Sequence, residues 1–170
     1  MTDFSFELHI APPRTTAQQK GERAILDAEG RPFILHFRKK EVVRIEKAYE
    51  NALRPHAPPA PLLGPVAVTF GYYFAATKDG AAAMRRAGVC LRRKTSKPDV
   101  DNIGKNLLDC MVRTGFFPDD SAVALIHAEK FEVTTRPRIL VRVRQLAEYP
   151  GDLFAAPLAP ADSGEAIEPA

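Results

Sequence analysis

The chain has 170 residues, of which 45% are apolar, with a formal net charge of +3 and two cysteines. This length and apolar content suit one domain with its own hydrophobic core. No apolar run is long enough to span a membrane, residues 1–20 lack a signal-peptide pattern, and two cysteines cannot build a disulfide framework. We therefore expect a cytoplasmic protein with no membrane partner, in which Cys90 and Cys110 are small buried apolar groups.

The first third of the chain predicts one strand and one helix. Apolar and polar residues alternate over residues 3–10, which is typical of a half-buried strand. Residues 11–13 (Ala-Pro-Pro) end that strand, and a polar loop is expected over residues 14–23. Residues 38–54 carry apolar side chains at helical spacing, and the proline-rich segment 55–65 ends this helix.

The remainder of the body predicts three strands and two helices. Residues 66–74 are β-branched and aromatic, as expected of a central strand. Residues 78–87 predict a short helix, and residues 101–112 predict a longer one with an apolar face. Residues 122–133 and 138–144 predict two further strands.

The C-terminal segment differs in composition from the body. Residues 147–170 are rich in Ala and Pro and carry five acidic and no basic residues. They predict a disordered acidic tail, which is a candidate for binding a replication or recombination protein. Residues 1–146 are then expected to form a single α+β domain, a mixed β-sheet of about four or five strands with helices packed on it.

The body is strongly basic once the tail is set aside. Residues 1–146 hold 24 basic against 16 acidic residues, a net charge of +8. Residues 80–98 contain no acid and hold six basic residues: Arg85, Arg86, Arg92, Arg93, Lys94 and Lys97. Such a surface suits a phosphate backbone, although charge alone is equally consistent with a solvated basic face.

A dense group of acids follows this basic stretch. Asp101, Lys105 and Asp109 are four residues apart on the 101–112 helix and so share one face, and Asp99 lies two residues earlier. Crowded carboxylates repel one another unless a cation lies between them, and carboxylate oxygens suit Mg²⁺ or Mn²⁺. Gly104 is a poor helix former in the first turn and would permit a close approach to the helix start.

A second acidic pair, Asp119-Asp120, precedes the next predicted strand. The start of that strand can lie beside the start of the preceding helix, which would bring three carboxylates together. Each feature also has a simpler explanation, since Asp99 or Asp101 could be a helix cap and Asp119-Asp120 a polar turn.

The spacing of these residues resembles a known family. Asp99-x-Asp101-Asn102-x-x-Lys105-x-x-x-Asp109, followed by Gly115-Phe116 and Asp119-Asp120-x-x-Val123, is similar to the core motif of the RusA family of Holliday junction resolvases. The likeness extends more loosely over residues 4–144. It implies a small homodimeric, Mg²⁺-dependent endonuclease that cuts branched DNA in recombination and repair and is typically encoded by a phage or prophage.

The resemblance also implies roles for individual residues. Asp99, Asp101 and Asp120 would be the metal-binding catalytic carboxylates, and Lys105 the essential lysine. Asp109 and Asp119 match motif positions whose roles are left open. The six basic residues of 80–98 would grip the duplex arms of a four-way junction.

Two other functions fit the same residues. The chain could be a metal-dependent nuclease for flaps, forks or other branched DNA, or a junction-binding protein that does not cut. The acids argue against a pure binder, because carboxylates facing phosphates weaken binding.

Overall fold

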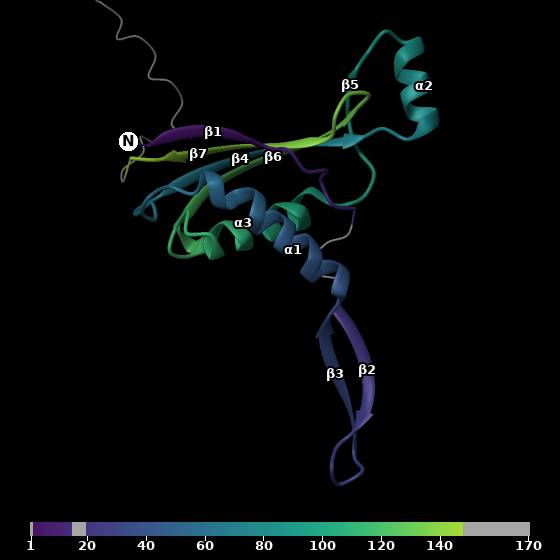
Figure 1. Cartoon of the computed structure of the whole chain (residues 1–170), viewed down its shortest axis with the longest axis vertical. Coiled ribbons are helices and arrows are strands. Elements are labelled where there is room, and N and C mark those ends of the chain that lie inside the picture. The colour runs from purple at the N-terminus through teal and green to yellow at the C-terminus, as the bar shows by residue number, and fades with distance from the viewer. Residues whose placement is uncertain (1, 15–19, 148–170) are drawn as a thin grey trace, which may run out of the picture.

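The structure of the protein, a computed structural model, describes residues 2–14 and 20–147. Its body is a five-stranded mixed sheet with strand order β1-β7-β4-β6-β5, and α1 and α3 lie on one face of it (Figure 1). The elements in chain order are β1 (Asp3–Leu8), β2 (Lys20–Leu26), β3 (Pro32–Arg38), α1 (Lys40–Leu53), the 3₁₀ turn η1 (Arg54–His56), β4 (Val66–Ala75), α2 (Lys78–Arg86), β5 (Leu91–Arg93), α3 (Val100–Arg113), the 3₁₀ turn η2 (Asp120–Ala122), β6 (Val123–Val133) and β7 (Arg138–Gln145).

The expected single-domain α+β fold is confirmed, and β4 is its central strand. It pairs in parallel with β6 on one side and antiparallel with β7 on the other. Its side chains Val68, Phe70 and Tyr72 are fully buried, whereas the intervening residues lie on the opposite face. The parallel pairing requires a crossover connection, and α3 lies within it.

The core lies between the sheet and the two long helices. Ile103, Leu107 and Met111 of α3 and Leu53 of α1 are completely buried in it. The chain leaves α3 at Gly115, which has φ +86°, and the N–H of Phe116 donates to the carbonyl of Met111 at 3.0 Å. The chain then turns back along the helix toward β6.

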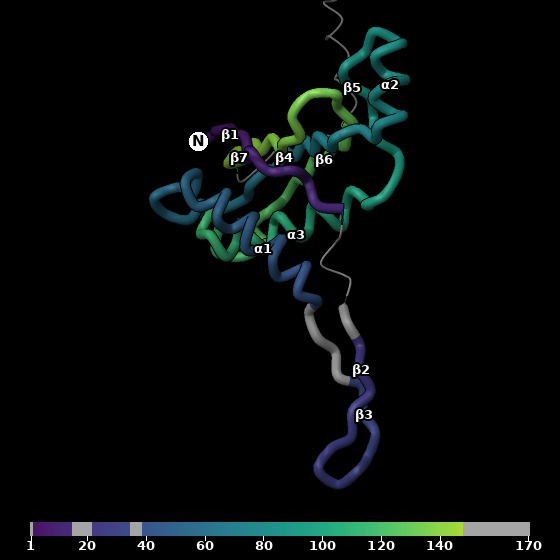
Figure 2. The backbone as a smooth tube through the Cα atoms, turned by 45° about the vertical axis from the view of Figure 1, so that its right-hand side comes forward, coloured from purple at the N-terminus to yellow at the C-terminus, as the bar shows by residue number. Residues whose placement is uncertain are grey.

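The prediction of a polar loop over residues 14–23 is wrong for residues 20–23, and residues 15–19 lie outside the described part of the chain. Residues 20–26 form β2, which pairs antiparallel with β3 in a hairpin that extends away from the body (Figures 1 and 2). At its tip the Asp27 carboxylate accepts the backbone N–H groups of Glu29 and Arg31, at 3.0 and 2.7 Å. These bonds hold the pKa of Asp27 below its usual value. The short apolar runs on both sides of this tip were not interpreted as strands from the sequence.

Two smaller features also differ from expectation. The three-residue strand β5 lies in the basic stretch, where no strand was expected, and it pairs with the end of β6. Cys110 is buried, and burial raises the pKa of its thiol to about 12. Cys90 is exposed, so the expectation that both thiols are buried holds only for Cys110.

The structure tests the expectation about membrane spans but not the one about the C-terminal tail. In the described residues no helix has the length and apolar character needed to cross a bilayer. The predicted acidic tail lies outside the described residues except for Ala147, so its disorder stays a prediction.

Candidate active site

A pocket of about 470 Å³ lies between α3 and β6, and three of the sequence-predicted residues line it. Asp101 and Lys105 come from the first half of α3, and Asp120 comes from η2 at the start of β6. The expectation that the strand start lies beside the helix is therefore confirmed. The rest of the lining is apolar: Val100, Leu108, Val123, Ile126 and Ala128, together with Gly104.

The orientation of α3 exposes the polar residues of the pocket. Because its apolar stripe is buried against the sheet, Asp101 and Lys105 point outward and are exposed. The Lys105 Nζ atom lies 4.0 Å from Oδ2 of Asp120, and both side chains are at least half exposed. The lysine therefore partly neutralises one carboxylate and is accessible to an anion at the same time.

Asp99 occupies the N-cap position of α3, but its side chain makes no capping hydrogen bond. The simpler explanation, that Asp99 or Asp101 caps the helix, is thus confirmed for the position of Asp99 but not for a capping bond from its side chain. Its exposed carboxylate lies one helical step before the pocket residue Val100. A cap position without a capping bond leaves this carboxylate available to another partner.

The two acids of the Asp119-Asp120 pair have different surroundings. The Asp119 carboxylate accepts the N–H of Ser121 at 2.9 Å and caps η2. Hydrogen bonds from Ser121 lower the pKa of Asp119. Asp120 instead lines the pocket. The simpler explanation as a polar turn is thus confirmed for Asp119, whereas Asp120 is a pocket residue.

The described residues contain no ready-made metal cluster. Among the described residues, no three histidine, cysteine, aspartate or glutamate side chains lie in positions that could hold one ion together. Asp101 and Asp120 share the pocket, whereas Asp99 and Asp109 do not line it. All three predicted ligands are exposed, so their side chains are free to change rotamer.

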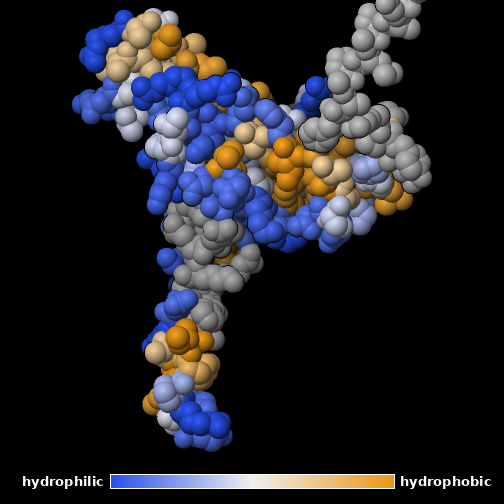
Figure 3. Space-filling view, turned by 180° about the vertical axis from the view of Figure 1, so that it is seen from behind, coloured by the Kyte–Doolittle hydropathy of each residue, from blue (hydrophilic) through white to orange (hydrophobic). Residues whose placement is uncertain are grey.

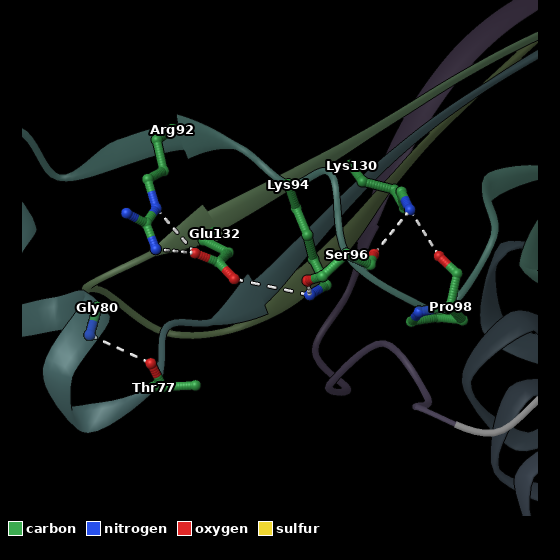
Figure 4. A network of polar contacts seen from close by, with 8 residues as sticks. All are labelled: Thr77, Gly80, Arg92, Lys94, Ser96, Pro98, Lys130 and Glu132. Atoms are coloured by element: carbon green, nitrogen blue, oxygen red, sulfur yellow. Dashed lines mark hydrogen bonds and ion pairs between the residues drawn. The ribbon is translucent and has the colours of Figure 1, made fainter.

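The predicted DNA-binding residues fall into two groups. Three of them are paired with acids of β6: Arg92 with Glu132 at 2.6 Å, Arg93 with Glu129 at 2.8 Å, and Lys94 with Glu132 at 3.6 Å. Lys94 is nearly buried and lies 5.3 Å from the centre of the Phe74 ring. These pairs fasten β5 and the segment after it to the sheet, and Figure 4 shows the two that Glu132 makes with Arg92 and Lys94.

The other three basic residues, Arg85, Arg86 and Lys97, are exposed. The first two lie in the last turn of α2, where cations interact favourably with the helix dipole. In the described part of the chain none of the three forms an ion pair. They are the members of the set whose charges remain available to a phosphate.

Lys130 of β6 has a role that was not expected from the sequence. Its ammonium group donates to the carbonyl oxygens of Ser96 and Pro98 at 3.0 and 2.6 Å (Figure 4). It therefore holds the segment that leads directly into Asp99. Lys130 and Glu132 lie on the face of β6 that points toward the helices, as the register with Tyr72 and Phe74 shows. Charged residues on this face of a predicted strand were the sequence signal that could have indicated the role of Lys130.

Acidic side chains and a lysine around one pocket, on a basic α+β body, define a class of site suited to phosphodiester chemistry. The family model described as endodeoxyribonuclease RusA matches residues 11–144, and the chain belongs to this family. A curated relative, the crossover junction endodeoxyribonuclease rusA of Lactococcus phage r1t, is 46% identical over 37 residues. That match spans 22% of this chain and 28% of the relative.

Loss of the Glu132 carboxylate is expected to destabilise the protein more than loss of Glu129. Glu132→Gln leaves the nearly buried Lys94 ammonium without its acid, which costs about 2 kcal/mol of unfolding free energy. Glu129→Gln is the matched control, because its partner Arg93 is 75% exposed and the loss should stay under about 1 kcal/mol. Urea unfolding followed by circular dichroism measures both, and equal losses would contradict the assigned role of Lys94.

The capping role of Asp119 predicts a pH dependence. A carboxylate with a lowered pKa stabilises the fold fully above its unfolded pKa, near 3.8, and less as the pH falls through the folded value. Asp119→Ala should therefore lower the unfolding free energy at neutral pH, and its difference from the parent chain should shrink in acid. Urea midpoints at a series of pH values test this, and a constant difference would show that the charge of Asp119 does not stabilise η2.

Proposed function

We propose that the protein is a metal-dependent endodeoxyribonuclease that resolves four-way DNA junctions by paired symmetric nicks. The observation that carries the proposal is the convergence of Asp101, Lys105 and Asp120 on one pocket in a chain of the RusA family. These motif positions are separated by up to 19 residues in sequence. If they were only helix caps and turn residues, nothing would require their side chains to lie on the same pocket.

Asp99, Asp101 and Asp120 are the proposed metal ligands. Their donor type fits Mg²⁺ or Mn²⁺, which take oxygen ligands, and two of them already line the same pocket. A bound ion would lower the pKa of a water molecule and neutralise charge on the phosphate. Both Asp101 and Asp120 are exposed, so their side chains are free to change rotamer toward an ion in the pocket that they share.

Lys105 is proposed to bind the scissile phosphate. Its ammonium group lies beside Asp120 and is 67% exposed, so a phosphate oxygen can reach it without displacing a buried pair. A fixed cation at this place stabilises negative charge that develops on the phosphate during cleavage. Arg85, Arg86 and Lys97 are proposed to contact the DNA backbone further away, and Arg93 can join them by releasing Glu129.

A homodimer is part of the proposal, because two symmetric nicks require two related sites. One face of the β2–β3 hairpin supports it. Ala24, Leu26, Pro32 and Ile34 lie on the same face by register, and all four are exposed. Figure 3 shows that the projecting hairpin carries apolar surface. An isolated two-stranded hairpin is only marginally stable, so a second copy of the chain that covers this face would stabilise it.

The central prediction is metal-dependent cutting of a synthetic four-way junction. With Mg²⁺, the purified protein should produce paired nicks at symmetric positions, and chelation should abolish them. Asp101→Asn should reduce cleavage by about 100-fold or more while junction binding survives, because it removes a ligand without removing basic residues. Product mapping on sequencing gels and a binding titration measure the two quantities separately.

Controls separate the alternatives. Asp119→Asn should cut nearly normally, because Asp119 caps η2 rather than facing the pocket. Preferred cutting of flaps or forks in side-by-side assays would favour a broader branched-DNA nuclease. Binding without any metal-dependent nick would favour a junction-binding protein. Normal cutting by Asp101→Asn would refute the metal assignment.

A change on the apolar face of the hairpin tests the dimer. Ile34 is 59% exposed, and Ile34→Glu should shift the protein from dimer to monomer in sedimentation velocity. Ala28→Glu, in the exposed turn of the same hairpin, adds the same charge outside this face and should stay dimeric. A dimer in both variants would exclude the hairpin as the interface, and a parent chain that is monomeric at all concentrations would exclude the dimer.

A further inference from the structure

The pocket between α3 and β6 is larger and more apolar than a metal and a phosphate require. Its volume of about 470 Å³ is in the range of small-molecule sites. The acids and Lys105 form only one part of its lining, and the remainder is aliphatic. A phosphate with its counter-ions gains nothing from aliphatic walls, so these walls need another explanation.

Gly104 gives the first indication of what they do. It lies in the interior of α3 with ordinary helical geometry, where glycine costs about 1 kcal/mol relative to alanine. A Cβ atom at this position would meet no heavy atom within 4 Å, so no neighbour forces the residue to be glycine. The missing side chain keeps open space, and that space is the pocket.

Ile126 gives a second indication of what the aliphatic walls do. It stands beside Val68 of β4 in the parallel register, and Val68 is fully buried under the helices. Ile126 is nevertheless 53% exposed, because α3 does not cover β6 at this position. The sheet therefore presents an uncovered aliphatic wall to the pocket that Gly104 also lines.

The edge of β6 adds polar backbone groups beside this wall. On the side away from β4, β6 pairs with β5 only from Phe131 to Val133. Within the described residues no strand pairs with that edge from Val123 to Glu129. The pocket thus combines a flat apolar interior with backbone N–H and C=O groups at its margin, which suits an uncharged heterocycle that carries hydrogen-bonding groups on its rim.

We propose that the pocket receives the base of a nucleotide next to the scissile phosphate, after that base has left the stack. The proposal rests on the proposed nuclease function, since a phosphate held by Lys105 and the carboxylates brings its own sugar and base to the pocket. The base face lies between Gly104 and Ile126. Gly104 and Ile126 are then residues that determine substrate specificity, and neither takes part in the chemistry.

This arrangement provides selectivity for branched DNA. Extruding a base costs a few kcal/mol in a continuous duplex and less where stacking is already interrupted. At a branch point the stack is interrupted, so a nucleotide there enters the pocket at lower cost than one within an arm. A strand from a second copy along the β6 edge is the alternative occupant, but such a strand does not require the missing side chain of Gly104.

Fluorescence of an extruded base tests the proposal directly. Asp101→Asn protein is bound to junctions that carry 2-aminopurine on either side of the cleaved phosphate. We expect a rise of about twofold or more at one of the two positions, because unstacking relieves quenching. The signal should also be protected from acrylamide. Gly104→Leu introduced into the same protein fills the pocket and should abolish both effects, whereas Ala48→Leu, at an exposed position of α1, should change neither.

Cleavage gives a second, independent measurement. In the otherwise unaltered chain, Gly104→Leu should lower kcat/KM on an intact junction by about tenfold or more. An abasic site at the responding position should restore cutting by this variant, and a merely misfolded variant would not be restored.

The outcomes distinguish the two proposals. Normal junction cutting with no fluorescence change at either position, or a rise that persists in Gly104→Leu, would overturn the base pocket and leave the nuclease function intact. Failure of the parent chain to bind or cut any junction would overturn the proposed function itself, and the base pocket with it.

Discussion

The burial of one stripe of α3 against the sheet is the constraint on which the site depends. Ile103, Leu107 and Met111 are completely enclosed, and a helix with three buried positions on one side cannot rotate without exposing them. The orientation of α3 about its own axis is therefore fixed, and with it the outward direction of Asp101 and Lys105. The parallel pairing of β6 with β4 then returns the chain so that Asp120 lies on the same pocket.

The second determinant is the placement of charge on β6. Lys130 and Glu132 occupy its inward face, where they bind the segment that connects β5 to α3. Part of the basic stretch is therefore structural, since Arg92 and Lys94 are neutralised by Glu132. The strand that holds the segment before Asp99 is therefore the same strand that forms a wall of the pocket.

In the proposed complex with DNA, the charged and the apolar surfaces of the pocket contact different parts of one substrate. Carboxylates and a lysine address a phosphate, which is charged and hydrated, whereas aliphatic walls address a base, which sheds water readily. The absent side chain of Gly104 lowers the intrinsic stability of the helix and preserves the space beside the charged residues. In this proposal, selectivity for branched DNA depends on stacking energy rather than on sequence-specific contacts.

The sequence by itself determined the elements with strong periodicity and the motif that indicates the family. Strand alternation in β1 and β7, the apolar run of β4 and the stripe of α3 could be predicted because local patterns specify them. Only the tertiary structure decided the rest. Strand β5 has only three residues, and β2 and β3 lack the regular apolar–polar alternation of β1. The ion pairs of β6 join residues up to 40 positions apart. The resemblance singled out Asp120 and left the role of Asp119 open. Only the structure shows that Asp119 caps η2 while Asp120 lines the pocket, because the fold fixes which carboxylate faces which neighbour.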